Sequence, residues 1–489
     1  MIARRIYAAV LIGILLRFVV NLTPVAWLVW FAPMPLLVLA YRSTARQTDW
    51  LTALAAMIGL SANFHYYRLV MPLRAVLLVL CLQALLWVLI VGATRRIVVR
   101  YQAWWTVFAY PVFWVAADTL EAHLLPDTNW GSLAYSQADL LPVLQFSSLF
   151  GVGGVLFLLA LLPSALALAA AYGSKIPKLW RAYAVTAVLL LFALEYGELR
   201  LHQPVSGTPV VFGMASIDDG IGLEATPAYI ATIWRSYDQH IADLAAQGAE
   251  VIVLPEKIGS ITPATASEWQ QHLSTLAAQH HLWIAAGVGI VDAGKKTNIE
   301  WLFAPDGRLD DTYQKHHMAP PERDNIPGTG FDVRSIGDRQ YGLAICKDMH
   351  FASLGRAYGE RRVSAMLVPA WDFDLDRWLA SRMTLTRGVE NGYTVVCSSR
   401  EGMLSVSDPF GRVLAERESR PLPGSALLVR AEIAPPLPTL YTRVGDLPGW
   451  LCVAAAAFLL GIGRGRRGEE ATAEGLRHSP QCLAEPRRR

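Results

Sequence analysis

The first two hundred or so residues are a series of apolar runs separated by short basic clusters. A helix that crosses the hydrocarbon core of a membrane needs about 20 mainly apolar residues, and most of these runs approach that length. We therefore expect a membrane domain of about seven helices in residues 1–200 and a final membrane-spanning helix in residues 446–463. The runs that predict them are Ile6–Val20, Val25–Ala40, Leu51–Phe64, Ala75–Gly92, Ala103–Leu120, Val143–Ala171, Ala182–Leu194 and Pro448–Ile462.

The basic residues between the runs predict how the chain crosses the membrane. They gather in alternate loops, at Arg4–Arg5, Arg42–Arg46, Arg95–Arg100, Lys175–Arg181 and Arg464–Arg467. Because short cytoplasmic loops are enriched in Lys and Arg, both termini are expected in the cytoplasm, and residues 204–436 are expected outside it. A cleaved signal peptide is the alternative for the first run. Since Arg17 interrupts that run and another run follows at once, we expect an uncleaved anchor.

The pattern changes between Pro204 and Pro436, where short buried strands alternate with helices. The segment Pro227–Gln247 has apolar residues at helical spacing, and Asp306–Gly307 is a hairpin turn. Interleaved strands and helices predict an α/β domain large enough for its own core. The expected strands are Val210–Met214, Val251–Leu254, Leu282–Ile290, Ile299–Ala304, Tyr341–Ile345, Ala365–Pro369, Tyr393–Cys397 and Met403–Val406.

Composition agrees with this division. Hydrophobic residues make up 53% of the 489 residues and charged residues 17%, where soluble domains carry about 25% charged residues. The mean hydropathy is +0.33. These values exclude a disordered chain and a disulfide scaffold, and a net charge of +3 gives no reason to expect nucleic acid as a partner. Residues 464–489 are polar and are expected to form a disordered cytoplasmic tail.

The cysteines suggest one candidate nucleophile. Cys81 and Cys452 fall in expected membrane helices and Cys482 in the tail, which leaves Cys346 and Cys397 in the α/β domain. These two could pair as a disulfide, and that alternative stays open. Cys346 comes between an expected strand and an expected helix at Phe351–Tyr358, where helix dipoles favour a thiolate. Cys397 lies within an apolar strand, so we expect it to be inert core.

Two charged residues occupy comparable positions at strand ends. Glu256 follows the strand Val251–Leu254, and Lys315 follows the strand that returns from the Asp306–Gly307 turn. A carboxylate and an ammonium that converge on the Cys346 thiol would supply a base, a charge stabiliser and a nucleophile. Taken singly, Glu256 could be a surface charge and Lys315 a solvated loop residue. The histidines His316, His317 and His350 fit no standard zinc spacing, so no metal is expected.

Several segments resemble known families. Leu254–Glu256, Tyr313–His317 and Ala344–Cys346 resemble the Glu-Lys-Cys signature of the nitrilase (carbon–nitrogen hydrolase) superfamily. Helices on both sides of such a domain resemble the apolipoprotein N-acyltransferase family, which has about eight spans with the nitrilase-like domain before the last. Further segments that fit this family are Trp130–Gln137, Leu149–Gly154, Arg387–Asn391 and Thr439–Asp446.

The resemblance implies a fold and a reaction. The α/β domain would be a four-layer α-β-β-α sandwich in the periplasm of a bacterium, anchored in the inner membrane. The enzyme would move an acyl chain from a phospholipid donor, through a thioester on Cys346, to the N-terminal amine of a diacylglyceryl lipoprotein acceptor. Glu256 would be the base and Lys315 would stabilise the oxyanion. No cofactor is expected, membrane lipid is the surrounding partner, and the chain is expected to be a monomer.

The chain departs from the family pattern near the site. Lys347–Asp348 stands where the family has Tyr-Glu, Ala319–Glu322 replaces Pro-Phe-Gly-Glu, and Pro369–Phe373 replaces Asn-Asp-x-Trp. By resemblance, Glu322 is the auxiliary glutamate and Asp348 its counterpart beside the cysteine.

These departures keep two alternatives open. One is a membrane-tethered amidase of the same superfamily that hydrolyses a small amide, and the other is an inactive scaffold or lipoprotein-binding module. A cleft that opens from the cysteine toward the membrane helices would favour acyl transfer between lipids.

Overall fold

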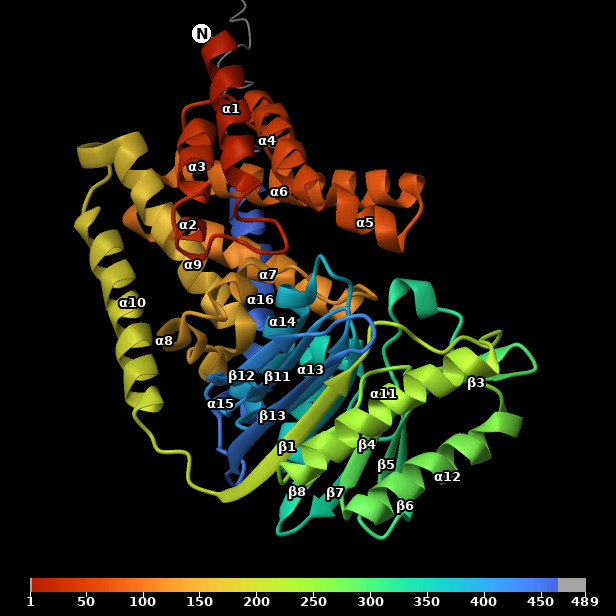
Figure 1. Ribbon diagram of the computed structural model, residues 1–489. Coiled ribbons are helices and arrows are strands. Elements are labelled where there is room, and N and C mark those ends of the chain that lie inside the picture. Colours follow the sequence, from red (N-terminus) through yellow and green to blue (C-terminus); the bar gives the residue numbers. More distant parts are fainter. Residues whose placement is uncertain (1, 465–489) are drawn as a thin grey trace, which may run out of the picture.

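The computed structural model describes residues 2–464, in which a helical region leads into an α/β domain and a last helix (Figure 1). Residues 465–489, which include Cys482 and most of the expected tail, lie outside the described residues. The helices before the α/β domain are α1 (Ile2–Leu16), α2 (Ala26–Val29), α3 (Pro33–Tyr41), α4 (Ala45–Leu60), α5 (Phe64–Val70), α6 (Leu73–Tyr101), α7 (Ala109–Leu124), α8 (Leu141–Leu144), α9 (Ser147–Tyr172) and α10 (Trp180–Leu201).

Each apolar run of the sequence lies mainly in one helix or in two consecutive helices. Three of these helices, α6, α9 with the turn that follows it, and α10, are long and apolar enough to cross a membrane. The segments Ala26–Tyr41 and Leu447–Gly463 are apolar but shorter. The number of about eight spans therefore stays a prediction, while the helical nature of all eight runs is observed.

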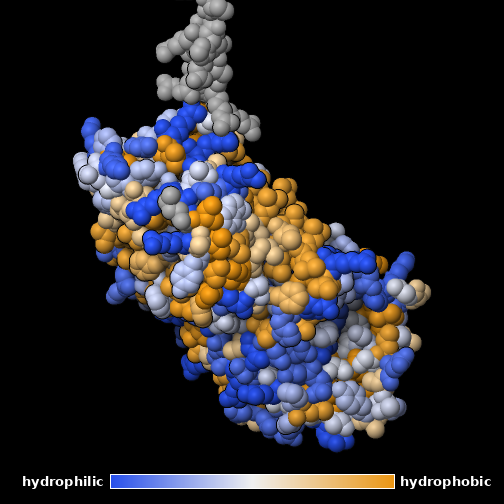
Figure 2. All heavy atoms as spheres, turned by 90° about the horizontal axis from the view of Figure 1, so that it is seen from above, coloured by the Kyte–Doolittle hydropathy of each residue, from blue (hydrophilic) through white to orange (hydrophobic). Residues whose placement is uncertain are grey.

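The outer surface of the long helices is apolar. On α6, the side chains of Leu77, Leu78 and Leu85 are each about half exposed or more, and Val188 and Leu191 of α10 are exposed to a similar extent. Hydrophobic side chains gather in broad patches on the face shown in Figure 2. Contiguous exposed apolar surface is rare on proteins that face only water, so this surface is that of a membrane protein.

The α/β domain contains two sheets. One has the strand order β13-β1-β2-β4-β5-β6, with β3 paired to β4, and the other has the order β12-β11-β10-β9-β8-β7. Within them, β1, β2 and β4 are mutually parallel, as are β8, β9 and β10, and the outer pairs are antiparallel. The strands are β1 (Thr208–Ser216), β2 (Val251–Val253), β3 (Ser260–Ile261), β4 (Trp283–Asp292), β5 (Lys295–Phe303), β6 (Leu309–Gln314), β7 (Val333–Ile336), β8 (Arg339–Leu343), β9 (Ala365–Trp371), β10 (Thr394–Arg400), β11 (Met403–Ser407), β12 (Val413–Glu418) and β13 (Ser425–Ile433).

The sheets pack face to face, and helices cover both outer faces. Strands β1, β2 and β4 pack against β9 and β10 through fully buried residues such as Phe212, Val253 and Leu367. Helices α11 (Pro227–Ala246) and α12 (Pro263–His280) cover the first sheet, and α13 (Ala352–Glu360) and α14 (Arg377–Asn391) cover the second (Figure 1). The expected four-layer α-β-β-α sandwich is confirmed, as are all eight expected strands.

Helix α14 also joins the α/β domain to the helical region. Arg387 donates to the hydroxyl of Tyr135 at 2.8 Å, and its Nη1 lies 2.9 Å from Oε2 of Glu390. Oε1 of Glu390 accepts a hydrogen bond from the backbone N–H of Val152 at 3.0 Å. Arg387 and Glu390 are fully buried, so three of the family-like segments meet in a single polar contact between the two regions.

The fourth family-like segment, Thr439–Asp446, also packs at this contact between the two regions. Tyr441, in the short helix α15 (Leu440–Val444), lies against Gly151 of α9, where φ is +64°. A Cβ atom at Gly151 would lie 2.5 Å from the Tyr441 ring, so the position requires glycine both for space and for its backbone angle. The chain then continues into α16 (Leu447–Arg464), which packs against α7.

Candidate active site

Cys346 lies just past the end of β8, in a sharp turn. Its φ is +46°, in the left-handed region that costs a residue with a side chain on the order of 1–3 kcal/mol. The turn continues as a short 3₁₀ helix, η6 (Cys346–His350), before α13 begins at Ala352. The side chain is buried, and Sγ lies 3.5 Å from the backbone carbonyl of Trp371 at the end of β9. The fold thus holds the thiol in a strained, fixed position at the carboxyl edge of the second sheet.

Glu256 and Lys315 contact each other directly. Glu256 follows β2, and its N–H donates to the carbonyl of Ala370 in β9 at 3.1 Å. Lys315 follows β6, and its Nζ lies 2.7 Å from Oε1 of Glu256 and 2.7 Å from Oε2 of Glu322. The side chains of Glu256 and Lys315 are about 2% and 1% exposed, so the pair is shielded from water and its geometry is fixed by charge-assisted bonds.

The two oxygens of Glu256 have different surroundings. Oε1 accepts from Lys315 and from the side-chain amide of Asn298 in β5, which also donates to Glu322 at 3.0 Å. Oε2 is buried and has no hydrogen-bond partner among residues 2–464. Oε2 is therefore the oxygen that can accept a proton, while Oε1 holds the carboxylate in place.

Asn298 is a member of this cluster that the sequence did not suggest. It lies one residue before the expected strand Ile299–Ala304, and its side chain is fully buried. In the sequence Asn298 is one amide directly before an apolar strand, and only the structure shows that it is buried. Lys257, which pairs with Glu322, was also not anticipated, although it directly follows Glu256.

Glu322 takes the place expected of an auxiliary carboxylate. It ends the short 3₁₀ helix η5 (Pro320–Glu322) and pairs with both Lys315 and Lys257. Burial opposes its ionisation, but the charges of Lys315 and Lys257 outweigh burial and lower the pKa of Glu322 to about 2. The two lysines thus favour the ionised form of Glu322, which in turn helps to keep Lys315 charged.

The electrostatics favour a protonated lysine and a protonated resting thiol. Burial disfavours the Lys315 ammonium, yet the charges of Glu256, Cys346 and Glu322 raise its pKa well above the usual value. Burial and the charge of Glu256 raise the pKa of Cys346 well above the usual value, and Lys315 only partly offsets this. The sequence led us to expect helix dipoles to favour a thiolate, but Cys346 begins the 3₁₀ helix η6, and residues 347–351 separate it from α13. A thiol in this state needs a neighbouring base to become a nucleophile.

Asp348 holds together the two loops that carry Lys315 and Cys346. Its buried carboxylate accepts hydrogen bonds from the hydroxyl of Tyr313 at 2.8 Å and from the backbone N–H groups of His316, His317 and Ile345 at 2.8–3.2 Å. These bonds hold the two loops together, and the role of Asp348 as the counterpart of Glu322 stays a prediction.

The histidines pack as aromatic rings. His317 stacks on Phe351 with ring centroids 3.6 Å apart, and His316 stacks on Tyr313 at 5.4 Å. His350 is buried, and burial together with the charge of Lys347 lowers its pKa to about 3. No group of three or more His, Cys, Asp or Glu side chains that could hold a metal occurs in residues 2–464. Cys397 and Cys346 are both free thiols, so the disulfide alternative is not observed.

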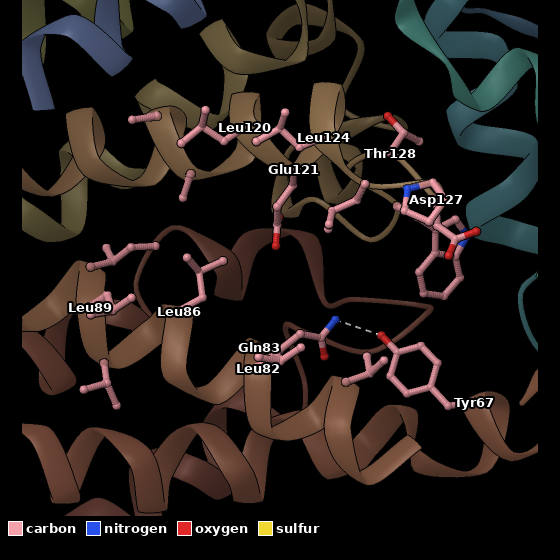
Figure 3. A pocket seen from close by; sticks show the side chains of 18 of the residues that line it. Tyr67, Leu82, Gln83, Leu86, Leu89, Leu120, Glu121, Leu124, Asp127 and Thr128 are labelled. Carbon is pink, nitrogen blue, oxygen red and sulfur yellow. Dashed lines mark hydrogen bonds between the residues drawn. The ribbon is translucent and has the colours of Figure 1, made fainter. Parts of the chain in front are cut away.

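A cavity of about 1740 Å³ leads from the thiol into the helical region. Near the thiol it is lined by Cys346, Lys347 and Trp371, and farther away by side chains of α6, α7 and α16. In Figure 3, Leu82, Leu86 and Leu89 of α6 face Leu120 and Leu124 of α7 across the cavity, and Glu121 points into it. The Cys346 thiol therefore lies at the end of a largely apolar groove between helices.

Both the helical region and the α/β domain match known protein families. Residues 12–166 match the apolipoprotein N-acyltransferase N-terminal domain, and residues 221–423 match the carbon-nitrogen hydrolase family. The chain is 26% identical to an apolipoprotein N-acyltransferase from Geobacter metallireducens, over 94% of this chain and 96% of that protein. It is 28% identical to an omega-amidase from Homo sapiens, over 42% of this chain and 87% of that protein. A solved structure of a mutant amidase from Nesterenkonia sp. AN1 aligns with a TM-score of 0.41 and 19% identity, covering 50% of this chain and 95% of that one.

Proposed function

We propose that this chain, which belongs to the apolipoprotein N-acyltransferase family within the nitrilase superfamily, moves an acyl chain from a phospholipid to the amine of a lipoprotein. The observation that carries the proposal is the apolar groove that runs between α6 and α7 and ends at Cys346. A small soluble amide needs no such approach. A phospholipid and a diacylglyceryl lipoprotein both carry long acyl chains next to the group that reacts.

In the first half-reaction, Glu256 accepts the proton of the Cys346 thiol on its free oxygen, Oε2. Sγ attacks the carbonyl carbon of a phospholipid ester, and the Lys315 ammonium together with a backbone N–H near Cys346 stabilises the oxyanion. The carbon–oxygen bond then breaks, and Glu256 returns the proton to the oxygen of the departing lysophospholipid. A thioester on Cys346 remains.

In the second half-reaction, the α-amine of the lipoprotein attacks the thioester carbon. Glu256 takes a proton from the attacking nitrogen, the carbon–sulfur bond breaks, and Sγ regains a proton as the amide leaves. One base serves both halves because the free oxygen of Glu256 is protonated and deprotonated in turn. Ping-pong kinetics follow from the covalent intermediate.

The same proposal includes a topology. The helices would cross the inner membrane of a bacterium about eight times, with the α/β domain in the periplasm and both termini in the cytoplasm. The alternation of basic loops along the sequence supports this orientation, and so does the apolar outer surface of α6 and α10.

Hydrolysis of a small amide is the second candidate. The likeness to an omega-amidase, over 42% of this chain and 87% of that protein, favours it. The apolar groove argues against it, since water as acceptor and a small amide as donor would use none of the lining of α6 and α7. An inactive scaffold is less consistent still with a buried, unpartnered carboxylate oxygen in the same cluster as the thiol.

The test is to incubate the full-length protein in detergent with phospholipid labelled in its acyl chain and to trap the thioester. We expect one label per chain on Cys346, sensitive to hydroxylamine and absent in Cys346→Ala. Cys397→Ala is the matched control, because it removes the other buried thiol of the domain, and it should keep the label. Addition of a diacylglyceryl peptide should then transfer the label to the peptide amine. Hydrolysis of simple amides without any labelling of Cys346 would overturn the proposal.

A further inference from the structure

A carboxylate of the helical region bridges two cations beside the nucleophile. Asp127, in the loop after α7, pairs through Oδ1 with Nζ of Lys347 and through Oδ2 with Nη2 of Arg323 at 2.8 Å. Lys347 also donates to the carbonyl of Met318 at 3.1 Å. Asp127, Lys347 and Arg323 all line the cavity that contains Cys346.

The cluster carries more positive than negative charge. An ammonium and a guanidinium face one carboxylate, and the Lys347 side chain is 7% exposed, whereas that of Asp127 is 38% exposed. His350, which lines the same part of the cavity, is buried, and its Nε2 has no hydrogen-bond partner among the described residues. Asp127 is therefore the more accessible partner in a cluster that has room for further negative charge and a further hydrogen bond.

We propose that Lys347 and Arg323 bind the phosphate of the acyl donor's headgroup and that Asp127 pairs with both cations while no lipid is bound. The inference rests on the proposed acyl transfer and names which part of the donor is recognised. A guanidinium and an ammonium are the side chains that bind phosphate oxygens most strongly. Because Lys347 directly follows Cys346, a phosphate held there keeps the glycerol esters, which are only a few bonds away, within reach of Sγ.

Other charged lining residues do not serve this purpose. Asp372 and Asp376 also line the cavity near the thiol, but a carboxyl group supplies no cation to pair with a phosphate. Arg95, Arg96 and Arg100 line its far end, near the carboxyl end of α6. With a rise of about 1.5 Å per residue along a helix, they lie too far from the thiol to set the position of an ester there.

The test compares two acyl donors with identical chains, phosphatidylglycerol and the phosphate-free diacylglycerol, in mixed micelles. The readout is the ratio of kcat/KM for thioester formation with the two donors. We expect Lys347→Met and Arg323→Gln each to lower this ratio about tenfold or more, since each loses a charge-assisted contact that only the phosphate makes. Arg308→Gln, which removes an exposed arginine at the β5–β6 turn, is the matched control and should leave the ratio as in the wild type.

A third variant keeps both cations. Asp127→Asn removes the competing carboxylate, so we expect a lower KM for phosphatidylglycerol and a raised ratio. The Asp127→Asn variant therefore tests the phosphate site even if the loss of Lys347 or Arg323 impairs folding. Inorganic phosphate should compete with phosphatidylglycerol in the wild type and more weakly in Lys347→Met.

Each outcome separates this inference from the proposed function. Labelling of Cys346 with a ratio that none of the three variants changes would overturn the phosphate site and leave acyl transfer standing. Inhibition by inorganic phosphate that is equal for both donors would assign the cluster to free anions and would also overturn the inference. No labelling of Cys346 by either donor would overturn the proposed function itself.

Discussion

Single residues define the chemistry of this molecule, and Glu256 illustrates how. One of its oxygens is held by Lys315 and Asn298, and the other has no partner in the part of the chain that the structure describes. A buried oxygen without a partner is costly, so its persistence in a well-packed domain indicates a use. We assign that use to proton transfer with Cys346.

Glu256→Gln tests this assignment. The substitution keeps the size of the side chain and its contact with Lys315 but removes the base, so we expect thioester formation to slow by about 10²–10⁴-fold. Single-turnover labelling of Cys346 measures the rate. Glu268→Gln, on the exposed side of α12, is the control and should be unaffected. A Glu256→Gln enzyme that acylates at the normal rate would remove Glu256 from the mechanism.

Asp376 makes stability depend on pH. It accepts a hydrogen bond from Tyr66 at 2.7 Å and is buried, and burial raises its pKa to about 6. The folded state thus binds this proton more tightly than the unfolded state does, so the contribution is fully present below the unfolded pKa and is lost as the pH rises through about 6. We expect the melting temperature of the wild type, relative to Asp376→Asn, to fall between pH 4 and pH 6. Asp374→Asn, which alters an exposed neighbour, should show no such trend, and a flat difference for Asp376→Asn would contradict the prediction.

The sequence indicated Glu256, Lys315 and Cys346 because each follows a strand, and strand ends of one edge converge. It could not indicate Asn298, whose place depends on how β5 pairs with β4 and β6. Nor could it indicate that Lys347 is held by Asp127, because more than two hundred residues separate the two and no local pattern links them. Asn298, which lies within its own strand, and Asp127, which comes from the helical region, were therefore missed.

At the scale of elements, α14 departs most from what its sequence suggests. It carries Arg382, Arg387 and Glu390, a composition typical of an exposed helix, yet from Leu379 onward it is buried. The reason is that α14 packs between the second sheet and the helical region, and its charges pair across both contacts. The strands β12 and β13 were missed for a related reason, since their charged or alternating residues suit the outer positions of each sheet.

The buried pair of Arg387 and Glu390 should contribute strongly to stability. Removal of one partner leaves the other charge buried, which typically costs about 3–5 kcal/mol. We expect Arg387→Met to lower the melting temperature of the detergent-solubilised protein clearly, whereas Lys296→Met, which breaks an exposed pair with Asp324, should cost less than about 1 kcal/mol. Equal shifts for the two variants would show that α14 does not fasten the two regions together.

At the scale of the whole molecule, the α/β domain is held on several sides. Helix α10 leads into it, α16 leads out of it, and α14 and α15 pack against α9 (Figure 1). The division into a helical region and an α/β domain followed from the hydrophobic pattern. The groove between α6 and α7 did not, because it depends on which helices are neighbours in space, and apolar composition alone does not set that.

Filling the groove should select against long acyl chains. Leu86 faces the cavity, so Leu86→Trp would narrow it, and we expect the ratio of acylation rates with long-chain and short-chain phospholipids to fall at least severalfold. Leu78→Trp is the matched control, because Leu78 lies on the exposed side of the same helix and does not line the cavity. Labelling of Cys346 with donors of each chain length measures the ratio. The same ratio in both variants would exclude the groove as the path of the acyl chain.

The groove also determines which concentration of each substrate sets the reaction rate. Because it opens along the sides of apolar helices, with those helices in a bilayer the donor and the acceptor would arrive by lateral diffusion in two dimensions. The turnover rate would then depend on the mole fraction of each substrate in the membrane and not on its amount per volume of solution. Diluting the bilayer with an inert lipid should slow the reaction, and diluting the suspension of vesicles with buffer should not.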